Sequence, residues 1–541
     1  MPHPQHRLAH FFPVAQLLIN GRIYSPFARD ASAMLVEDGV IGWVGDGASA
    51  SAFAADETID LNGALVVPGF VDAHFHATDT GLALTGLDLS GTPSLAEALR
   101  QLEMHARKAG GRPVLGTGWD ETTWPEGRPP TARELDRASY GGVVYLSRTD
   151  AHSAVVSSAL MAAVPELKAM AGYRDDGLLI TDAHHAARTI ALTSITAAQL
   201  TELQLIALRH AASLGVVAVH EMAGPEISGE TDLRHLMALA GDPELPAVTA
   251  YWGELRAIAK ARELGARGAA GDLFLDGSIG SHTAALTRPY ADAPDNTGYL
   301  HHDTAEVAEH ILECTAAGLQ AGFHAIGDAA IDQAVAAMRL AIERDPRVAQ
   351  SRHRLEHAEL IGNVAAFAEV GLIASVQPVF DATWGGDDGM YARRLGRDRA
   401  ARLNPLAALA SHGVPLALGS DSPVTPVGPW EAVRAAAYPH YSEHAITPRA
   451  ALTAHCRGGW RAADADGDGH GVLAPGSPAS FAVYEAGGLG VDAPDPALAS
   501  WSTDERSGVP GLPDLAPGVE LPRCLRTVRQ GVTLFDSGEL S

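Results

Sequence analysis

Two histidines separated by a single residue, His74 and His76, are the residues of this chain best suited to chemistry. Successive side chains of a β-strand point to opposite faces, so residues two apart lie on the same side and are able to grip one cation. The pair follows the apolar run from Val66 to Asp72, which is typical of a buried strand. By itself such a pair is more often part of a polar loop than of a metal site, but its position at a strand end favours a metal site.

Three further apolar stretches end in residues of the metal-ligand type. They place His324 in GFHAIGD, His357 in RLEHA and Asp421 in PLALGSD. Each alone has a structural explanation, because a histidine after a strand is commonly hydrogen-bonded in the core and an aspartate there commonly caps the next helix. Together with the first pair they put four histidines and one aspartate at strand ends, which predicts a metal-binding site.

Four other residues are candidates for contact with a substrate. His152 lies in AHSAVVSSAL, where a capping or core role is the alternative. His220 ends the run VVAVH, where orienting a ligand imidazole is the alternative. Trp119 and Trp384 are candidates for an apolar pocket wall, with buried packing as the alternative.

The elements that must position these residues begin and end with short strands. LLINGRIY and SAMLVEDGVIGWVGDG predict strands joined by tight turns, with Asn20-Gly21 and Asp38-Gly39 as hairpin signals. A similar pattern returns near the end of the chain in FAVYE and LRTVRQGVTLFDSG. We therefore predict that residues 1–65 and 471–541 form a composite β-sandwich beside a central domain.

Residues 66–470 alternate short apolar strands with Ala- and Leu-rich helical stretches; GGVVYLS, VVAVHE and QAGFHAIGD are examples of the strands. This α/β alternation predicts a TIM-type (β/α)8 barrel with insertions. An open doubly wound sheet is the alternative, although no glycine-rich phosphate turn follows the first strand. The Pro-, Gly- and Asp-rich stretch from about 485 to 520 is expected to be a long loop of the terminal domain.

The composition restricts the classes of partner. The 541 residues carry 39 basic and 65 acidic side chains, a formal charge of −26, which disfavours nucleic acid and anionic membranes. No run of about eighteen apolar residues is present, so we expect no membrane span and a cytoplasmic protein. The three cysteines form no CxxC pair, so a metal must be held by histidine and carboxylate.

The chain is similar to the amidohydrolase superfamily, and within it to the amidohydrolase 3 (YtcJ-like) group, which includes N-substituted formamide deformylases. The resemblance covers most of the chain. It rests on motifs that occur in order: VVPGFVDAHFH, GWDETTWPEGRPPTARELD (118–136), SRTDAHSAVVSSAL (147–160), GVVAVHEMAGP (215–225), LDGSIGSHTAAL (275–286), GFHAIGDAAID (322–332), LEHAEL (355–360) and LGSDSPVTPVGPW (418–430).

This resemblance implies an α/β barrel with an accessory β-sandwich built from both chain ends. It implies metal ligands from barrel strands 1, 5, 6 and 8, which here are His74, His76, His324, His357 and Asp421. It also implies hydrolysis of a non-peptide carbon–nitrogen bond, in a small amide or an N-substituted formamide. A divalent ion, which we expect to be zinc, would activate water, with Asp421 as general acid/base and His324 or His357 steadying the oxyanion.

One position departs from the pattern. Many members carry Lys-x-x-x-Asp-Gly on strand 4, where the lysine is carboxylated and bridges two metals, but this chain has Asp272 there, four residues before Asp276. A carboxylate reaches several ångströms less far, which leaves three alternatives for Asp272: it binds one ion, it binds through water, or it does not bind. We therefore favour one ion and leave a second ion open.

Three alternatives to amide hydrolysis remain at this point. Barrels of this superfamily also hydrolyse esters or lactones, and some isomerise their substrates. The lost lysine also leaves a catalytically silent metal- or ligand-binding protein as an alternative, because a fold does not determine a function. In each case the partner is a small molecule, and a homodimer is an open expectation because relatives commonly form dimers.

Overall fold

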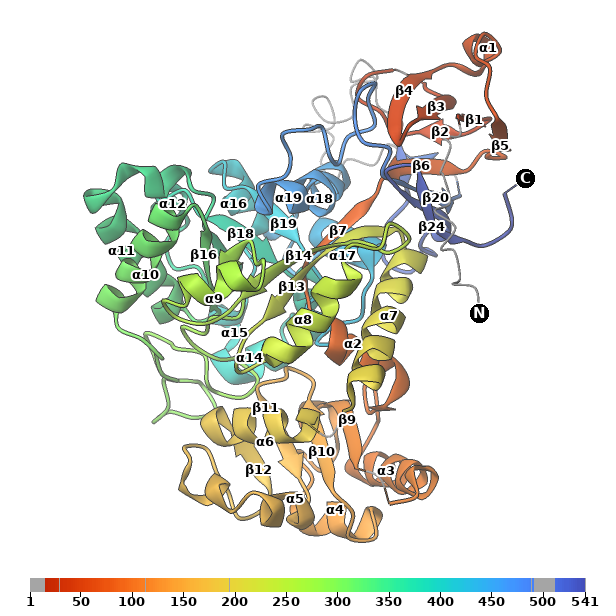
Figure 1. The fold of residues 1–541 in the computed structure, drawn as a ribbon. Helices are drawn as coiled ribbons and strands as arrows, with labels where there is room; N and C mark the ends of the chain where they lie inside the picture. The colour runs from red at the N-terminus through yellow and green to blue at the C-terminus, as the bar shows by residue number, and fades with distance from the viewer. Residues whose placement is uncertain are drawn as a thin grey trace, which may run out of the picture.

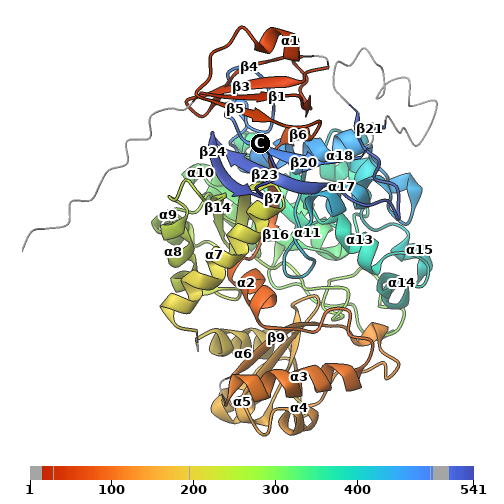
Figure 2. The same cartoon turned by 90° about the vertical axis from the view of Figure 1, so that its right-hand side faces the viewer.

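A computed structural model describes residues 15–28, 30–111, 113–193, 195–487, 489–490 and 511–540. Three parts follow one another along the long axis of the molecule (Figures 1 and 2). Sheets from both chain ends lie at one end, an eight-stranded barrel lies in the middle, and a lobe of residues 87–193 lies at the other end. We call this last part the insert lobe. Within the described residues, no helix is long and apolar enough to cross a membrane.

The central part is the predicted (β/α)8 barrel. Its strands are parallel, and neighbours in the sheet follow the order of the chain. A bridge between Phe75, the last residue of the first strand, and Ser422, which follows the last strand, brings these two strands together. The eight strands are β7 (Phe70–Phe75), β13 (Val216–Ala223), β14 (Ala247–Trp252), β15 (Gly268–Ala269), β16 (Gln320–Ala325), β17 (Arg354–His357), β18 (Ile373–Val376) and β19 (Leu416–Leu418).

Helices cover the barrel because each connection returns over the outside of the sheet. Local signals set their ends: Asp303 and Glu306 form a capping box at the start of α10, and Gly318 ends that helix in a left-handed conformation. The covering helices are α2 (Ala77–Thr85), α7 (Ala197–Ser213), α8 (Gly229–Leu239), α9 (Ile258–Glu263), α10 (Thr304–Ala317), α11 (Asp328–Arg344), α12 (Val364–Glu369), α13 (Pro378–Trp384), α14 (Met390–Leu395), α15 (Arg397–Ala400), α16 (Leu406–Ser411), α17 (Pro429–Ala437), α18 (Pro448–His455) and α19 (Arg457–Ala462).

Strands from both chain ends form two further sheets whose inner faces share one apolar core. The first sheet has the order β4-β3-β1-β5, with β1 (Gln16–Ile19), β3 (Ala33–Glu37), β4 (Val40–Gly45) and β5 (Glu57–Asp60). The second has the order β2-β6-β20-β23-β24, with β2 (Arg22–Ile23), β6 (Leu65–Pro68), β20 (Phe481–Glu485), β23 (Arg523–Arg529) and β24 (Val532–Asp536). The two ends of the chain therefore complete each other's packing.

One predicted hairpin is wrong. Asp38-Gly39 does join the paired strands β3 and β4, but Asn20-Gly21 joins β1 to β2, which lie in different sheets. Asn20 has φ 57°, so the turn chemistry is present. The turn redirects the chain from one sheet to the other because β1 pairs with β3 and β5, while β2 pairs with β6.

The insert lobe was not expected from the strand and helix alternation. The stretch GGVVYLS, predicted as a barrel strand, forms β10 (Val144–Arg148) of a separate sheet with the order β12-β11-β10-β9-β8. Both kinds of sheet contain parallel strands followed by helices, so the pattern alone does not distinguish them. The other elements are β8 (Leu87–Asp88), β9 (Val114–Trp119), β11 (Ser153–Val156), β12 (Leu178–Ile180), α3 (Leu95–Ala109), α4 (Ala132–Ala138), α5 (Ser158–Ala163) and α6 (Thr181–Thr193).

The predicted long loop from about 485 to 520 falls largely outside the described residues. Of its described parts, β21 (Leu489–Gly490) pairs with β22 (Leu512–Pro513) in a two-stranded antiparallel ladder.

Candidate metal centre

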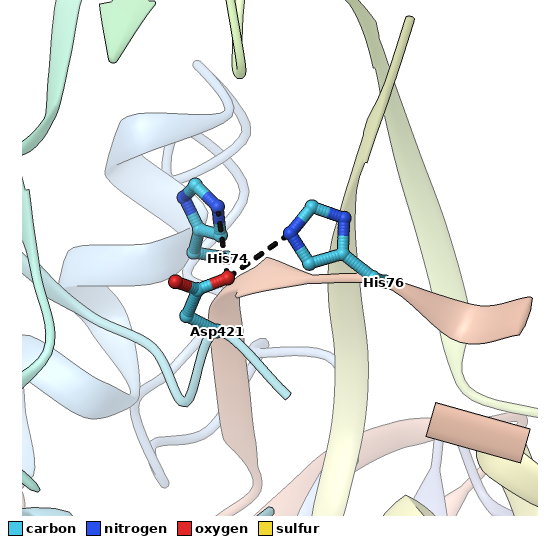
Figure 3. A group of neighbouring side chains, drawn as sticks. All are labelled: His74, His76 and Asp421. Atoms are coloured by element: carbon cyan, nitrogen blue, oxygen red, sulfur yellow. Dashed lines mark hydrogen bonds and ion pairs between the residues drawn. The ribbon is translucent and has the colours of Figure 1, made fainter. Parts of the chain in front are cut away.

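The two histidines of the HxH pair lie at the end of the first barrel strand. His74 belongs to β7, and His76 follows it and stands before the first residue of α2. One carboxylate oxygen of Asp421, Oδ1, lies 3.4 Å from Nε2 of His74 and 3.0 Å from Nε2 of His76 (Figure 3). All three side chains are buried. The first and last barrel strands therefore deliver one carboxylate and two imidazoles to a single point.

Backbone and side-chain hydrogen bonds hold these two strand ends in register. The N–H of Asp421 donates to the carbonyl of His74 (2.8 Å), and the N–H of His76 donates to the carbonyl of Ser422 (3.2 Å). Asp72 completes the link: its carboxylate accepts hydrogen bonds from the backbone N–H (2.8 Å) and the hydroxyl (2.6 Å) of Ser420. Movement of Asp421 relative to the histidines would break this set of bonds.

Asp272 also reaches the centre, from the segment that follows the short strand β15. Its Oδ2 lies 3.3 Å from Nε2 of His76, and its Oδ1 lies 3.5 Å from Nε2 of His74. Nε2 of His357 lies 3.8 Å from the same Oδ1. Among the alternatives for this position, the geometry favours a direct ligand.

His357 and His324 come from the neighbouring strands β17 and β16, and their ring centroids are 4.4 Å apart. His357 has φ 70°, a left-handed conformation that costs energy for a non-glycine residue and is common at functional sites. Its Nδ1 lies 2.9 Å from Oε1 of Gln377, an acceptor, so Nδ1 carries the proton and Nε2 keeps its lone pair. His324 has Nδ1 3.6 Å from Oδ1 of Asp276.

A buried ion pair inside the barrel orients His74. Nδ1 of His74 lies 3.0 Å from Oε2 of Glu356, and both side chains are fully buried. Arg354 donates to Glu356 from Nε (2.5 Å) and from Nη2 (3.0 Å). The carboxylate is thereby paired, so it accepts the Nδ1 proton of His74 and leaves Nε2 free to bind a metal. Burial opposes ionisation of Glu356, but Arg354 and His74 lower its pKa to about 2.

Opposite charges dominate the electrostatics of the centre. Burial opposes the charged form of His74, but Asp272 and Asp421 raise its pKa well above the usual value. Burial likewise opposes ionisation of Asp421, but His74 and His76 lower its pKa. Burial instead lowers the pKa of His324 to about 3, with a contribution from the neighbouring His357, so this imidazole is neutral at neutral pH. Such mutual shifts are common at functional sites.

The residues present fit a divalent cation. Nε2 of His74 and Oδ1 of Asp272 are buried and have no hydrogen-bond partner within the described part of the chain, although burying such atoms unpaired is costly. Two groups of three ligand atoms, each within 4.8 Å of one another, share His74: one adds His76 and Asp421, the other Asp272 and His357. Imidazole and carboxylate together suit zinc and other first-row divalent ions.

The pocket over this centre lies between the barrel and the insert lobe. Its barrel side includes the predicted ligands His76, Asp272, His324, His357 and Asp421. The insert lobe contributes the opposite wall, which includes Leu115, Gly116, Tyr145, Arg148, Asp150, His152, His185 and Arg188. Asp150 also fastens the lobe to the barrel, because its Oδ2 accepts hydrogen bonds from the hydroxyls of Ser278 (2.7 Å) and Ser281 (2.8 Å).

The four candidate substrate residues lie in different places. His152 lines the pocket, with its ring centroid 5.0 Å from that of His324. Trp384 lines a smaller recess beside the centre. Neither Trp119 nor His220 is among the residues that line these two cavities: the Trp119 indole donates to the carbonyl of Leu146 (2.8 Å), and Nδ1 of His220 lies 3.0 Å from Nη1 of Arg354.

Sequence reasoning missed the residues that hold the ligands in place. Arg354 and Glu356 are two apart on β17, so both point into the barrel, where unpaired charges would not be tolerated. Two residues of opposite charge on the same face of a short strand were a readable signal of an ion pair. The role of Asp72 gave no such signal, because its partner Ser420 is 348 residues away in the chain.

Comparisons with known proteins show the family of this chain. A sequence model described as "Amidohydrolase family" matches residues 57–535. The chain is 30% identical to Protein LONG AFTER FAR-RED 3 of Arabidopsis thaliana, covering 87% of each chain. It is 24% identical to the N-substituted formamide deformylase of Arthrobacter pascens, covering 77% of this chain and 82% of that one. The crystal structure of an uncharacterized metal-dependent hydrolase from Pyrococcus horikoshii superposes with a TM-score of 0.70 at 26% identity, covering 87% of this chain and 98% of that one.

Proposed function

This chain belongs to the amidohydrolase family, and we propose that it is a metal-dependent hydrolase that cleaves a non-peptide carbon–nitrogen bond in a small amide. One observation carries the proposal: the Oδ1 atom of Asp421 lies within 3.4 Å of Nε2 in both His74 and His76, at the carboxyl end of a parallel barrel. Active sites of such barrels lie at this end.

His74, His76, Asp272 and Asp421 would hold one divalent ion, which we propose to be zinc, and His357 lies close enough to the same atoms to join them. When bound, the ion supplies Lewis acidity, which polarises a carbonyl group and makes an attacking water more acidic. A second ion is not part of the proposal, because the lysine that bridges two metals in many members is replaced by Asp272.

Asp421 would act as the general acid/base. Its carboxylate is buried and held by the surrounding strand ends, and its lowered pKa keeps it ionised at neutral pH. It accepts the proton of the attacking water and then donates that proton to the nitrogen of the departing amine, which makes the amine a better leaving group.

His324 would steady the tetrahedral oxyanion with a ring N–H group, and His357 is the alternative donor. His324 is the better candidate, because its pKa of about 3 keeps the ring neutral and its position on β16 faces the pocket. His357 would serve only with both ring nitrogens protonated, because its Nδ1 proton is already donated to Gln377.

Formamides are the first amides to test, because one relative is named as an N-substituted formamide deformylase. The apolar part of the pocket, which includes Leu82, Leu115, Ala191 and Ile227, suits an uncharged N-substituent.

The partner is a small molecule. We propose a cytoplasmic location, and we also propose a homodimer, which size measurement in solution tests.

The experiment is a hydrolysis screen of the metal-loaded protein over matched formamides, acetamides, esters and lactones. We expect turnover of at least one amide, with loss on chelation and recovery on adding zinc. Turnover of esters or lactones only would replace the proposed bond. Bound metal with no turnover anywhere in the screen would favour a silent binding protein.

A further inference from the structure

A small recess beside the metal centre has no role in the proposed reaction. It is lined by Glu359, Phe380, Trp384, Met390 and Tyr391, and it opens onto the centre at His324, His357 and Asp421. The space in it that is open to the centre of a water molecule is about 30 Å³, which is room for about two water molecules or a small polar group. We call it the Glu359 recess.

An unbroken row of aromatic rings forms its wall. The ring of His357 stacks on Phe380 with centroids 6.0 Å apart and an interplanar angle of 11°. Phe380 lies 5.0 Å from Trp384, and Trp384 lies 6.3 Å from Tyr391, again between ring centroids. The negative faces of such rings attract cations.

Glu359 supplies a carboxyl group that is not fully used. The residue is 2% exposed, and its Oε2 has no hydrogen-bond partner within the described residues. The Tyr391 hydroxyl hydrogen-bonds to the carboxyl, which leaves acceptor capacity on Oε2. Asp150, which also lines the recess, is paired with Arg148 at 3.0 Å. Glu359 is therefore the acceptor left open to a ligand.

We propose that the Glu359 recess is a subsite for a cationic N–H donor, an ammonium or guanidinium group, carried by the substrate beside the bond that is cleaved. The aromatic rings and the buried carboxyl group are the two features that recognise such a cation, since ring faces attract positive charge and the ionised carboxyl group accepts its hydrogen bonds. The inference rests on the proposed function only where it says which bond lies beside the cation. Binding of the cation in the recess does not require turnover.

The test compares the binding of two probes to the full-length, metal-loaded protein. Methylguanidinium is the cationic probe; it has no basic lone pair for the metal. Methylurea has nearly the same shape but no charge. Calorimetry and the quenching of tryptophan fluorescence give the two dissociation constants. We expect methylguanidinium to bind at least about tenfold more tightly, and Glu359→Gln to abolish this preference.

Two further variants separate recognition from loss of structure. Trp384→Leu removes the aromatic wall but keeps the carboxyl group, so it is expected to weaken methylguanidinium binding without unfolding the protein. Glu221→Gln changes another buried carboxyl group that does not line the recess and is expected to keep the tenfold preference. Metal content and thermal unfolding are measured for each protein.

Two results would overturn the subsite: equal binding of the two probes by the unmodified protein, or an unchanged preference in both Glu359→Gln and Trp384→Leu. Either would mean that the recess does not select a cation. Hydrolysis of amides together with equal probe binding would overturn the subsite alone. Preferential binding without any hydrolysis would overturn the proposed function alone.

Discussion

The Oδ2 atom of Asp272 lies 3.3 Å from Nε2 of His76, although a carboxylated lysine occupies this position in many related barrels. The backbone after strand β15 brings this short side chain to the histidines. Strand β15 ends at Ala269, and Gly271 then adopts φ 85°, where an added Cβ would lie 2.7 Å from Sδ of Met222. A glycine is needed at this turn, and the turn carries Asp272 inward to the histidines.

This position leads to a prediction about metal content. The purified protein should contain one divalent ion per chain, and Asp272→Asn should lower the affinity for that ion at least about tenfold, because it removes one charged ligand from the centre. Elemental analysis and competition with a chelator measure both quantities. Asp388→Asn, at an exposed position, is the control. Two ions per chain, or an unchanged affinity in Asp272→Asn, would contradict the single-ion centre.

Asp421→Asn should lower kcat by about 10²- to 10⁴-fold, the range typical for loss of a general acid/base, while the fold is retained. The amide is nearly the same size as the carboxylate but has no basic oxygen to accept a proton. Steady-state kinetics on the best substrate of the screen, with circular dichroism and metal analysis on the same sample, give the result. Full activity with normal metal content would exclude Asp421 from proton transfer.

Glu356→Gln should weaken metal binding by about 10- to 100-fold, although Glu356 is not itself a predicted ligand. The neutral amide no longer balances Arg354, and it no longer favours the His74 tautomer that leaves Nε2 free. Metal affinity and the urea midpoint are measured together, since breaking a buried ion pair typically costs about 3–5 kcal/mol. Glu254→Gln, at an exposed position, is the matched control. If the urea midpoint falls while metal affinity is unchanged, Glu356 has only a structural role.

Stability should depend on pH through Glu221. Burial raises the pKa of this carboxyl group from 4.5 to about 8. The folded protein therefore keeps a proton that the unfolded chain has lost. The contribution of this group to the free energy of unfolding is therefore most favourable below about pH 4.5. It decreases as the pH rises and is fully lost above about pH 8, a total change of about 5 kcal/mol at most.

The side chain of Glu221→Gln stays neutral at every pH. The urea midpoint of this variant should therefore rise relative to that of the unmodified protein as the pH increases from about 5 to about 9. The hydrogen bond from the N–H of Ala77 to the side-chain oxygen is available in both proteins. Glu202→Gln, at an exposed position, controls for the loss of one carboxylate. Parallel curves for Glu221→Gln and the unmodified protein would show that Glu221 is ionised in the folded state.

Much of the architecture was readable from local patterns. The barrel followed from the alternation of strands and helices, and the pairing of the chain ends followed from two sets of short strands. The spacing of His74 and His76, and the strand-end positions of His324, His357 and Asp421, were enough to predict a shared site. Parallel strands bring their carboxyl ends to one edge of the sheet. Residues distant in the chain therefore meet there, and no sequence pattern that links one residue to another is needed to predict it.

Other features depended on contacts between distant segments. The stretch containing β10 has the composition of a barrel strand, and only its pairing with β9 and β11 places it in the insert lobe. The Asn20-Gly21 turn has hairpin chemistry, and the choice of strand partners decides that it crosses between sheets.

The sequence by itself determined which residue types meet at the barrel end, because strand periodicity and chain order are local properties. The tertiary structure decided how these residues are used. The inward turn at Gly271 brings Asp272 to His76, the Arg354–Glu356 pair orients His74, and the insert lobe closes the pocket. These outcomes depend on distances between segments far apart in the chain, and such distances exist only once the barrel has closed.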